Sequence, residues 1–240
     1  MEGLVAANLS KRYGQKEVVH SVNLNLGKQE VVGLLGPNGA GKTTTFYMLV
    51  GIVKPNTGDV SFNGQNITDQ PLHERARLGI SYLPQESSIF KKLTVRQNLE
   101  IILEQTSMTP RQQNARAEEL MDMFTISKLA DQPAMFLSGG ERRRLEIARA
   151  LILNPSFILL DEPFAGIDPI AVIDIQEIIS VLKSMGIGIL ISDHNVRETL
   201  NICDRAYLVY EGTIILEGTP EVIVQDSQAR QIYLGEDFCL

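Results

Sequence analysis

The chain has 240 residues, 44% of them hydrophobic, and a net charge of −7. This length and composition fit one sizeable globular domain with a core that needs no disulfide bonds, and they exclude a largely disordered chain. The acidic balance argues against a broad nucleic-acid-binding face, which needs Lys and Arg to neutralise phosphates. We therefore expect no nucleic-acid partner.

The cysteine content and the apolar runs bear on the compartment. The only cysteines are Cys203 and Cys239, and the first residues form no apolar signal segment. We expect plain thiols in a reducing cytoplasm. No run approaches the roughly 18 to 20 consecutive apolar residues that span a bilayer. We therefore expect no direct membrane insertion, so a partner would have to hold the protein at a membrane.

Short runs rich in Val and Leu, bounded by polar residues or glycine, predict a first third that is mostly β-structure. The expected strands are Leu4–Asn8, Val18–Leu26, Val31–Leu35 and Asp59–Asn63. A helix is expected at Thr43–Val50, because this segment follows a glycine-rich turn. Strand, loop and helix thus follow one another at residues 31–50.

The rest of the chain has two patterns. From Thr94 to Ala150 apolar residues recur three and four positions apart among charged ones, which predicts helices. Beyond Ala150, apolar strands alternate with helices, which predicts βαβ units and a parallel sheet. The expected elements there are strands Phe157–Leu160, Ile187–Ile191 and Ala206–Tyr210, and helices Val172–Met185 and Val196–Ile202.

A phosphate-binding loop follows the strand Val31–Leu35 and opens a helix, which is the context that gives this motif its meaning. Its glycines let backbone N–H groups face phosphates, and the helix N-terminus adds a positive dipole end. Lys42 would reach the β- and γ-phosphates, and the Thr43 hydroxyl would bind Mg²⁺. A chance glycine-rich turn is the alternative. The expected ATP-binding residues here are Gly36, Pro37, Asn38, Gly39, Ala40, Gly41, Lys42, Thr43 and Thr44.

Two carboxylates, Asp161 and Glu162, end the apolar strand Phe157–Leu160. The first would organise Mg²⁺, as in the Walker B element of P-loop enzymes. Glu162 would then lie closer to the γ-phosphate and act as the general base that activates water. Alternatively, both acids would only cap the turn at Pro163, a reading that the phosphate-binding loop disfavours.

A second glycine-rich helix start occurs at Leu137-Ser138-Gly139-Gly140-Glu141. It also suits phosphate, although Ser138 could serve as an ordinary helix N-cap as well. At this point the sequence resembles the ABC ATPase family, whose signature LSGGQ binds a nucleotide held by the other subunit. The resemblance implies a homodimer with two ATP molecules between its subunits, and contacts from Ser138, Gly139 and Gly140.

Further positions match the family's motifs in order. The resemblance implies adenine stacking by Tyr13, a Q-loop at Gln85, a D-loop ending at Asp168 and a catalytic switch histidine at His194. It also implies that Mg²⁺ is bound by Thr43, Gln85 and Asp161. Two positions depart from the family pattern: Glu141 replaces the common Gln of the signature, and Ala165 replaces the common Ser of the D-loop.

The resemblance implies an α/β fold with a P-loop NTPase (RecA-like) core. It also implies that residues 1–240 form a single ABC ATPase domain. An N-terminal antiparallel β subdomain and an inserted α-helical subdomain would complete it. The core is expected at residues 1–90 and 154–240, and the helical signature subdomain at 91–153.

Within the family, the sequence resembles the ATP-binding subunits of lipopolysaccharide exporters. The resemblance rests on phrases such as Asp161–Ile170, Asp193–Leu200 and the arginines of Leu137–Arg144. Local ion pairs on a solvated helix face are the alternative role for at least one of these arginines. The resemblance implies two transmembrane permease subunits that handle the lipid, and attachment to the cytoplasmic face of a bacterial inner membrane. An ATPase of a branched-chain amino-acid importer is the alternative.

A membrane-independent ATP-gated regulatory ATPase is a further alternative. Members that act in translation carry two ATPase domains, and those that act in DNA repair carry a long coiled coil, whereas this chain has one P-loop and 240 residues. Phe90, just after the Q-loop, leaves two readings open. It would either anchor a helix of a membrane partner or pack inside the helical subdomain.

Overall fold

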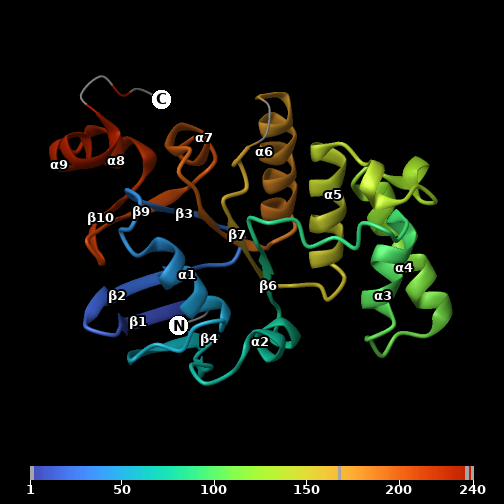
Figure 1. Ribbon diagram of the computed structural model, residues 1–240, viewed down its shortest axis with the longest axis horizontal. Helices are drawn as coiled ribbons and strands as arrows, with labels where there is room; N and C mark the ends of the chain where they lie inside the picture. The colour runs from blue at the N-terminus through green and yellow to red at the C-terminus, as the bar shows by residue number, and fades with distance from the viewer. Residues whose placement is uncertain (1–2, 167–168, 236–237, 239–240) are drawn as a thin grey trace.

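Ten strands and nine α-helices are present in the computed structural model, which describes residues 3–166, 169–235 and 238 (Figure 1). The strands are β1 Leu4–Tyr13, β2 Lys16–Leu26, β3 Val31–Leu35, β4 Thr57–Phe62, β5 Gln65–Asn66, β6 Ile80–Leu83, β7 Phe157–Asp161, β8 Gly188–Ser192, β9 Arg205–Tyr210 and β10 Thr213–Gly218. The helices are α1 Lys42–Val50, α2 Leu72–Leu78, α3 Val95–Leu103, α4 Pro110–Met123, α5 Gly139–Ala150, α6 Pro169–Ser184, α7 Val196–Leu200, α8 Pro220–Gln225 and α9 Ser227–Ala229.

The central sheet has the order β10-β9-β3-β8-β7-β6 within the described residues. Pairs from β9 to β6 are parallel, and β10 joins β9 as an antiparallel edge. Every residue of β3, β7 and β8 is buried. Strands that are covered on both faces consist of continuous apolar residues, which is why these three strands can be predicted from the sequence.

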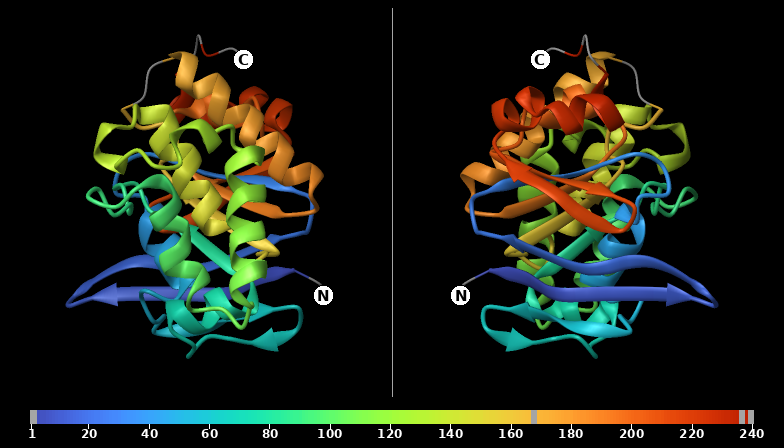
Figure 2. Two further views of the ribbon diagram at one scale, coloured as in Figure 1. Left: turned by 90° about the vertical axis from the view of Figure 1, so that its right-hand side faces the viewer. Right: turned by 90° about the vertical axis from the view of Figure 1, so that its left-hand side faces the viewer.

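The smaller sheet is antiparallel, with the order β2-β1-β4-β5 within the described residues. Its long β1–β2 hairpin projects beyond the body of the molecule (Figure 2). One apolar cluster joins this sheet to α1 and to the central sheet, through residues such as Leu9, Phe46 and Leu159. Helix α1 is therefore held by both sheets at the point where the phosphate-binding loop enters it.

Helices α3, α4 and α5 gather at one end of the molecule, beside α6 (Figure 1). Each of the three begins with a capping box, in which an N-cap hydroxyl and the side chain three residues on bond to each other's backbone N–H groups. The N-caps are Thr94, Thr109 and Ser138. The proposed division of the chain at residues 91 and 153 stays a prediction.

The observed elements match most of the expected ones, although their ends shift, most of all at the strand expected over Leu4–Asn8, which extends to Tyr13. The expected strand Asp59–Asn63 begins at Thr57, and the helix expected from Val172 begins at Pro169. Sequence reasoning missed α2, β5, β6, β10, α8 and α9. The missed helices α2, α8 and α9 have seven, six and three residues, about two turns at most, which is too few to display a helical period, and β5 has only two residues.

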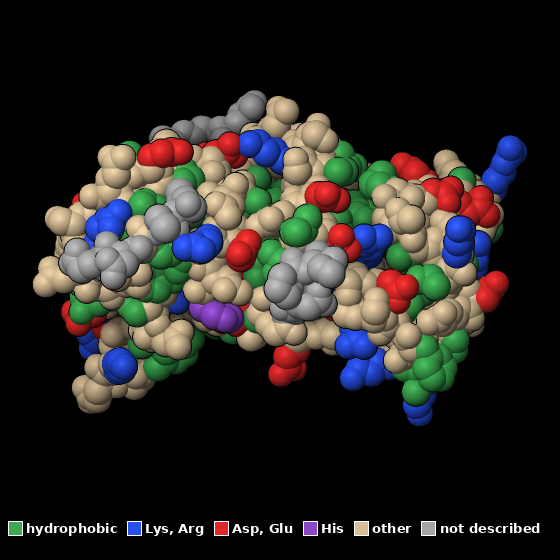
Figure 3. Space-filling view, turned by 90° about the horizontal axis from the view of Figure 1, so that it is seen from above, with side chains coloured by type: hydrophobic (Ala, Val, Ile, Leu, Met, Phe, Trp, Pro, Cys, Tyr) green, Lys and Arg blue, Asp and Glu red, His purple; other side chains and the backbone are tan. Residues whose placement is uncertain are grey.

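The distribution of charge, the cysteines and the apolarity of the helices can be described for the same residues. Figure 3 shows acidic and basic side chains interspersed over one face, with no continuous basic field among its described residues. Cys203 is a buried free thiol, and burial raises its pKa, while Cys239 lies outside the described residues. None of the described helices is long and apolar enough to cross a membrane.

Candidate nucleotide-binding site

The phosphate-binding loop connects β3 to α1 and depends on two glycines. Gly36 has φ +146°, and a Cβ there would lie 2.1 Å from the carbonyl oxygen of Val209. Gly41 has φ +101°, and its Cβ would lie 2.6 Å from the carbonyl oxygen of Val18. Left-handed backbone and close approach to other strands thus both require glycine at these positions.

Lys42 is the first residue of α1 and is buried. Its Nζ donates to the carbonyl oxygens of Gly36 and Pro37, at 2.6 and 3.0 Å. Burial lowers the pKa of this amine, although the nearby carboxylates oppose that shift. The ammonium group therefore lies against the backbone of the phosphate-binding loop, beside a helix N-terminus suited to anions.

A pocket runs from this loop to the β1–β2 hairpin. Tyr13 lies at its hairpin end and is half exposed, with the Nζ of Lys11 5.5 Å from its ring centre. Sequence reasoning missed Lys16 and Val18, which line the same pocket. Their position three and five residues after Tyr13 in a hairpin is the signal that could have found them. The lining residues are Tyr13, Lys16, Val18, Asn38, Gly39, Gly41, Lys42, Thr43, Thr44 and Glu162.

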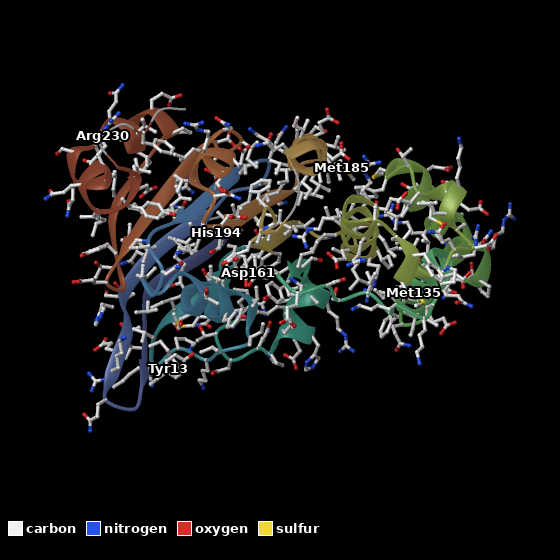
Figure 4. All side chains as sticks on the ribbon, turned by 45° about the horizontal axis from the view of Figure 1, so that its top comes forward. Tyr13, Met135, Asp161, Met185, His194 and Arg230 are labelled. Atoms are coloured by element: carbon white, nitrogen blue, oxygen red, sulfur yellow. The ribbon has the colours of Figure 1, made fainter. Side chains whose placement is uncertain are left out.

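Asp161 ends β7 near His194, while Tyr13 lies farther off by the hairpin (Figure 4). The carboxylate of Asp161 is buried, with 5% of the residue exposed, and its Oδ2 accepts a hydrogen bond of 3.3 Å from the Tyr82 hydroxyl. Burial raises the pKa of Asp161 to about 6, although that hydrogen bond acts in the opposite direction. At neutral pH the carboxylate is therefore mainly ionised and able to bind a cation.

Glu162 turns sharply away from the strand, with φ +46°. Its backbone N–H donates to the carbonyl oxygen of Ser192 over 2.6 Å, which holds the turn against β8. Its Oε2 accepts a 2.7 Å hydrogen bond from Nε2 of Gln85 and lies 3.4 Å from Nδ1 of His194. The structure thus brings together Gln85, Glu162 and His194, which the sequence places far apart.

Asp193 is a buried residue of this site that sequence reasoning missed. It is fully buried, and its two oxygens accept hydrogen bonds of 2.8 Å from the backbone N–H groups of Phe164 and Asn195. Burial raises its pKa, against the effect of these two bonds. Asp193 therefore ties the turn after Glu162 to the loop that carries His194. Its position directly before that histidine was the available signal.

The donor chemistry of the three predicted metal ligands fits a nucleotide-bound Mg²⁺. Thr43, Gln85 and Asp161 offer the hydroxyl, amide and carboxylate oxygens that this ion prefers. Among the described residues no group of three or more His, Cys, Asp and Glu side chains could hold a metal by itself. Such a site would therefore need phosphate oxygens as further ligands, as is usual for Mg²⁺.

The signature segment lies outside this pocket. Ser138 caps α5: its Oγ bonds to Oε2 of Glu141 at 2.8 Å, and its backbone N–H donates to the same oxygen at 2.8 Å. Glu141, which replaces the Gln common in the family, thus still forms a capping box with Ser138. Gly140 is the second residue of α5, and Gly139 lines a second pocket. That second pocket is lined by Gln85, Ser87, Gly139, Arg142, Arg143, Glu146, Glu162, Pro163, Ala165 and Gly166.

Glu162 borders both pockets, so one carboxylate faces the phosphate loop and the start of α5. Two of the three arginines there form local ion pairs: Arg143 with Glu146 at 3.0 Å, and Arg144 with Asp174 at 2.8 Å. The first pair lies within α5 but is almost buried, with exposed fractions of 11% and 7%, and the second joins α5 to α6, so neither is a local pair on a solvated helix face. Asp168, the expected D-loop residue, lies outside the described residues.

Comparison with known proteins decides the family. Residues 19–165 match the family described as ABC transporter. The chain belongs to the ABC transporter family. It is 55% identical to the lipopolysaccharide export system ATP-binding protein LptB of Haemophilus influenzae, and 56% identical to that of Escherichia coli K12, over the whole of each chain.

Solved ABC structures agree with this fold. An ATP-binding cassette of an ABC transporter in its ADP conformation has a TM-score of 0.88 and 32% identity, and the match covers 98% of this chain and 100% of that one. A dimeric cassette in a post-hydrolysis state, bound to ADP and Pi, has a TM-score of 0.78 and 25% identity. That match covers 90% of this chain and 98% of the other one. This ABC protein is an ATPase with a P-loop α/β fold, as the sequence predicted. The roles of its individual residues stay predictions.

Proposed function

We propose that this ABC ATPase drives the export of lipopolysaccharide from a bacterial inner membrane. The observation that carries the proposal is its 55–56% identity, over full length, to proteins named for that export system. In this proposal two copies of the chain attach to the cytoplasmic face of the membrane through two permease subunits of the LptF and LptG kind. Those subunits, and not this chain, contact the lipid.

Each site residue has a proposed role in nucleotide binding. Tyr13 stacks on adenine, the loop from Gly36 to Thr44 wraps the phosphates, and Lys42 neutralises their charge. Mg²⁺, bound by Thr43, Gln85 and Asp161, would supply positive charge that stabilises the phosphoryl group being transferred.

The remaining residues would act on water and on the partner's nucleotide. Glu162 orients the attacking water and accepts its proton, and His194 donates a hydrogen bond to the γ-phosphate. Ser138, Gly139 and Gly140 offer a helix N-terminus to the nucleotide of the opposite subunit. The separation of this segment from the phosphate-loop pocket supports the shared site, as does the dimeric form of a similar cassette.

Replacement of the Escherichia coli protein tests the proposal. In cells depleted of their own LptB, expression of this chain should restore growth and the delivery of lipopolysaccharide to the outer membrane. The matched control is Glu162→Gln, which should fold but fail to restore either. Normal expression of the unmodified chain without restoration of transport would count against the proposal.

Purification of the tagged chain from solubilised membranes of its own host separates the alternatives. Two permease subunits with bound lipopolysaccharide are expected. A branched-chain amino-acid permease in their place would support the importer alternative, which has similar motifs. Recovery of the chain without any membrane protein would support the regulatory ATPase.

A further inference from the structure

Tyr82 lies where the elements of the proposed metal site meet. It is the third residue of β6, three positions before Gln85, and it pairs with Leu159 of β7, two positions before Asp161. Its ring packs against two aromatic residues of α1, the helix that begins at Lys42 and Thr43. The ring centres lie 6.0 Å from that of Phe46 and 6.3 Å from that of Tyr47.

The hydroxyl of Tyr82 has two polar partners, the Tyr47 side chain and the carboxylate of Asp161. It donates a hydrogen bond of 3.3 Å to Oδ2 of Asp161, across 79 positions of the sequence. A carboxylate that is held by one oxygen cannot rotate freely about its terminal bond, so the other oxygen keeps a fixed direction. Partners of this kind orient metal-binding carboxylates in many proteins, and their loss weakens metal binding.

Simple packing does not require this hydroxyl. A phenylalanine ring would fill the same space between Phe46, Tyr47 and β7, and it would avoid placing a polar atom in a partly buried position. Burial of a tyrosine hydroxyl is favourable only when the hydroxyl finds a partner, and here its partners are the Tyr47 side chain and the carboxylate that ends β7.

We propose that Tyr82 is a positioning residue for Asp161, which fixes the orientation of this carboxylate toward the Mg²⁺ of a bound nucleotide. The inference rests on the proposed role of Asp161 as a metal ligand. Because the Tyr82 ring also contacts α1 and precedes Gln85, it would keep the three proposed metal-binding segments in one arrangement. Tyr82 itself touches neither nucleotide nor metal.

Mg²⁺-dependent nucleotide binding to the isolated full chain tests the inference. Fluorescent ADP is titrated in EDTA, and Mg²⁺ is then titrated at a fixed concentration of this nucleotide. Tyr82→Phe should leave the affinity in EDTA and the melting temperature unchanged. It should raise the half-saturating Mg²⁺ concentration on the order of ten-fold, as is typical when a partner of a metal ligand is lost.

Two further variants make the outcome decisive. Tyr207→Phe removes a bonded tyrosine hydroxyl elsewhere in the central sheet, where its partner is Arg205, and should leave the half-saturating Mg²⁺ concentration as in the unmodified chain, so an equal shift in both variants would overturn the inference. Asp161→Asn should abolish the Mg²⁺ dependence. If it does and Tyr82→Phe matches the unmodified chain, the inference on Tyr82 fails alone. If Asp161→Asn keeps the Mg²⁺ dependence, the assignment of the metal ligand fails, and the inference with it.

Discussion

Gln85 donates a hydrogen bond of 2.7 Å to the Glu162 carboxylate, although the two residues are 77 positions apart in the sequence. Nδ1 of His194 lies 3.4 Å from the same oxygen, on another loop. The proposed general base is thus held between a side chain that follows β6 and one that follows β8. Three segments must fold against one another before this carboxylate acquires its position.

Lys42 and Glu162 should fail in different ways when substituted. Lys42→Ala removes the cation at the phosphate loop, so nucleotide binding should weaken strongly. Glu162→Gln keeps the size and polarity of the side chain, so binding should persist while kcat falls by about 10²- to 10⁴-fold, the usual contribution of a general base. Equilibrium binding of fluorescent ATP and steady-state phosphate release measure the two effects.

Glu162→Gln should also trap an ATP-bound dimer, which light scattering would detect after gel filtration. The control is Glu86→Gln, a change of an exposed acid in the loop that follows Gln85. It should leave turnover close to normal. Substantial steady-state hydrolysis by a clean Glu162→Gln preparation would show that another residue acts as the base.

The shared site predicts complementation between two inactive variants. Ser138→Arg blocks the signature segment and Lys42→Ala blocks the phosphate loop. A mixed dimer then has one site damaged twice and one site intact, because each site combines the loop of one subunit with the signature of the other. Mixing the two variants should restore hydrolysis, measured against each variant alone. Two independent monomeric sites would give no recovery, and they would also keep full specific activity on dilution.

Much of the fold is predictable because its signals are local. The buried strands β3, β7 and β8 are continuous apolar runs, and the phosphate loop combines glycine spacing with the strand and helix on either side. Capping boxes such as that of Ser138 and Glu141 mark helix starts in the sequence itself.

The remaining features depend on contacts between distant segments. The hydrogen bond from Tyr82 to Asp161 and the ties from Asp193 to Phe164 and Asn195 arise only when β6, β7 and β8 align. Short helices such as α2, with seven residues, repeat the helical period less than twice, so tertiary packing decides their form. Arg75 illustrates this point, because its sequence neighbours give no sign that it is buried.

Substitution of Arg75 should destabilise the protein more than that of any exposed arginine. Its side chain is fully buried, and its guanidinium donates to the carbonyl oxygens of Met48, Leu49, Thr68 and Gln70, at 2.6 to 3.0 Å. Arg75→Met would leave these acceptors without their donor, at a cost of about 3 kcal/mol in the free energy of unfolding. Urea denaturation measures it. Arg77→Met, at an exposed position of the same helix, is the control and should change stability by about 0.5 kcal/mol or less.

The environment of Phe90 separates the two roles that the sequence leaves open for this residue. The side chain is 45% exposed, and the guanidinium carbon of Arg149 lies 5.1 Å from its ring centre. A ring this exposed is not a core residue, so the interior reading is wrong. Its backbone is fixed by Asn98, which accepts from the Phe90 N–H at 2.8 Å and donates to the Phe90 carbonyl oxygen at 3.1 Å.

Phe90 is therefore held at the surface by its backbone, as an anchor for a partner helix would be. Phe90→Ala should lower the free energy of unfolding by about 0.5 kcal/mol or less, as for other surface changes, where a core position would lose about 3 to 5 kcal/mol. The isolated variant should bind and hydrolyse ATP normally, while loss of a hot-spot ring should weaken assembly with the permease subunits by about 2 kcal/mol or more. Co-purification of the permease subunits measures the assembly, with Phe136→Ala as a control at another exposed aromatic position. Normal recovery of the complex with Phe90→Ala would rule out the anchoring role.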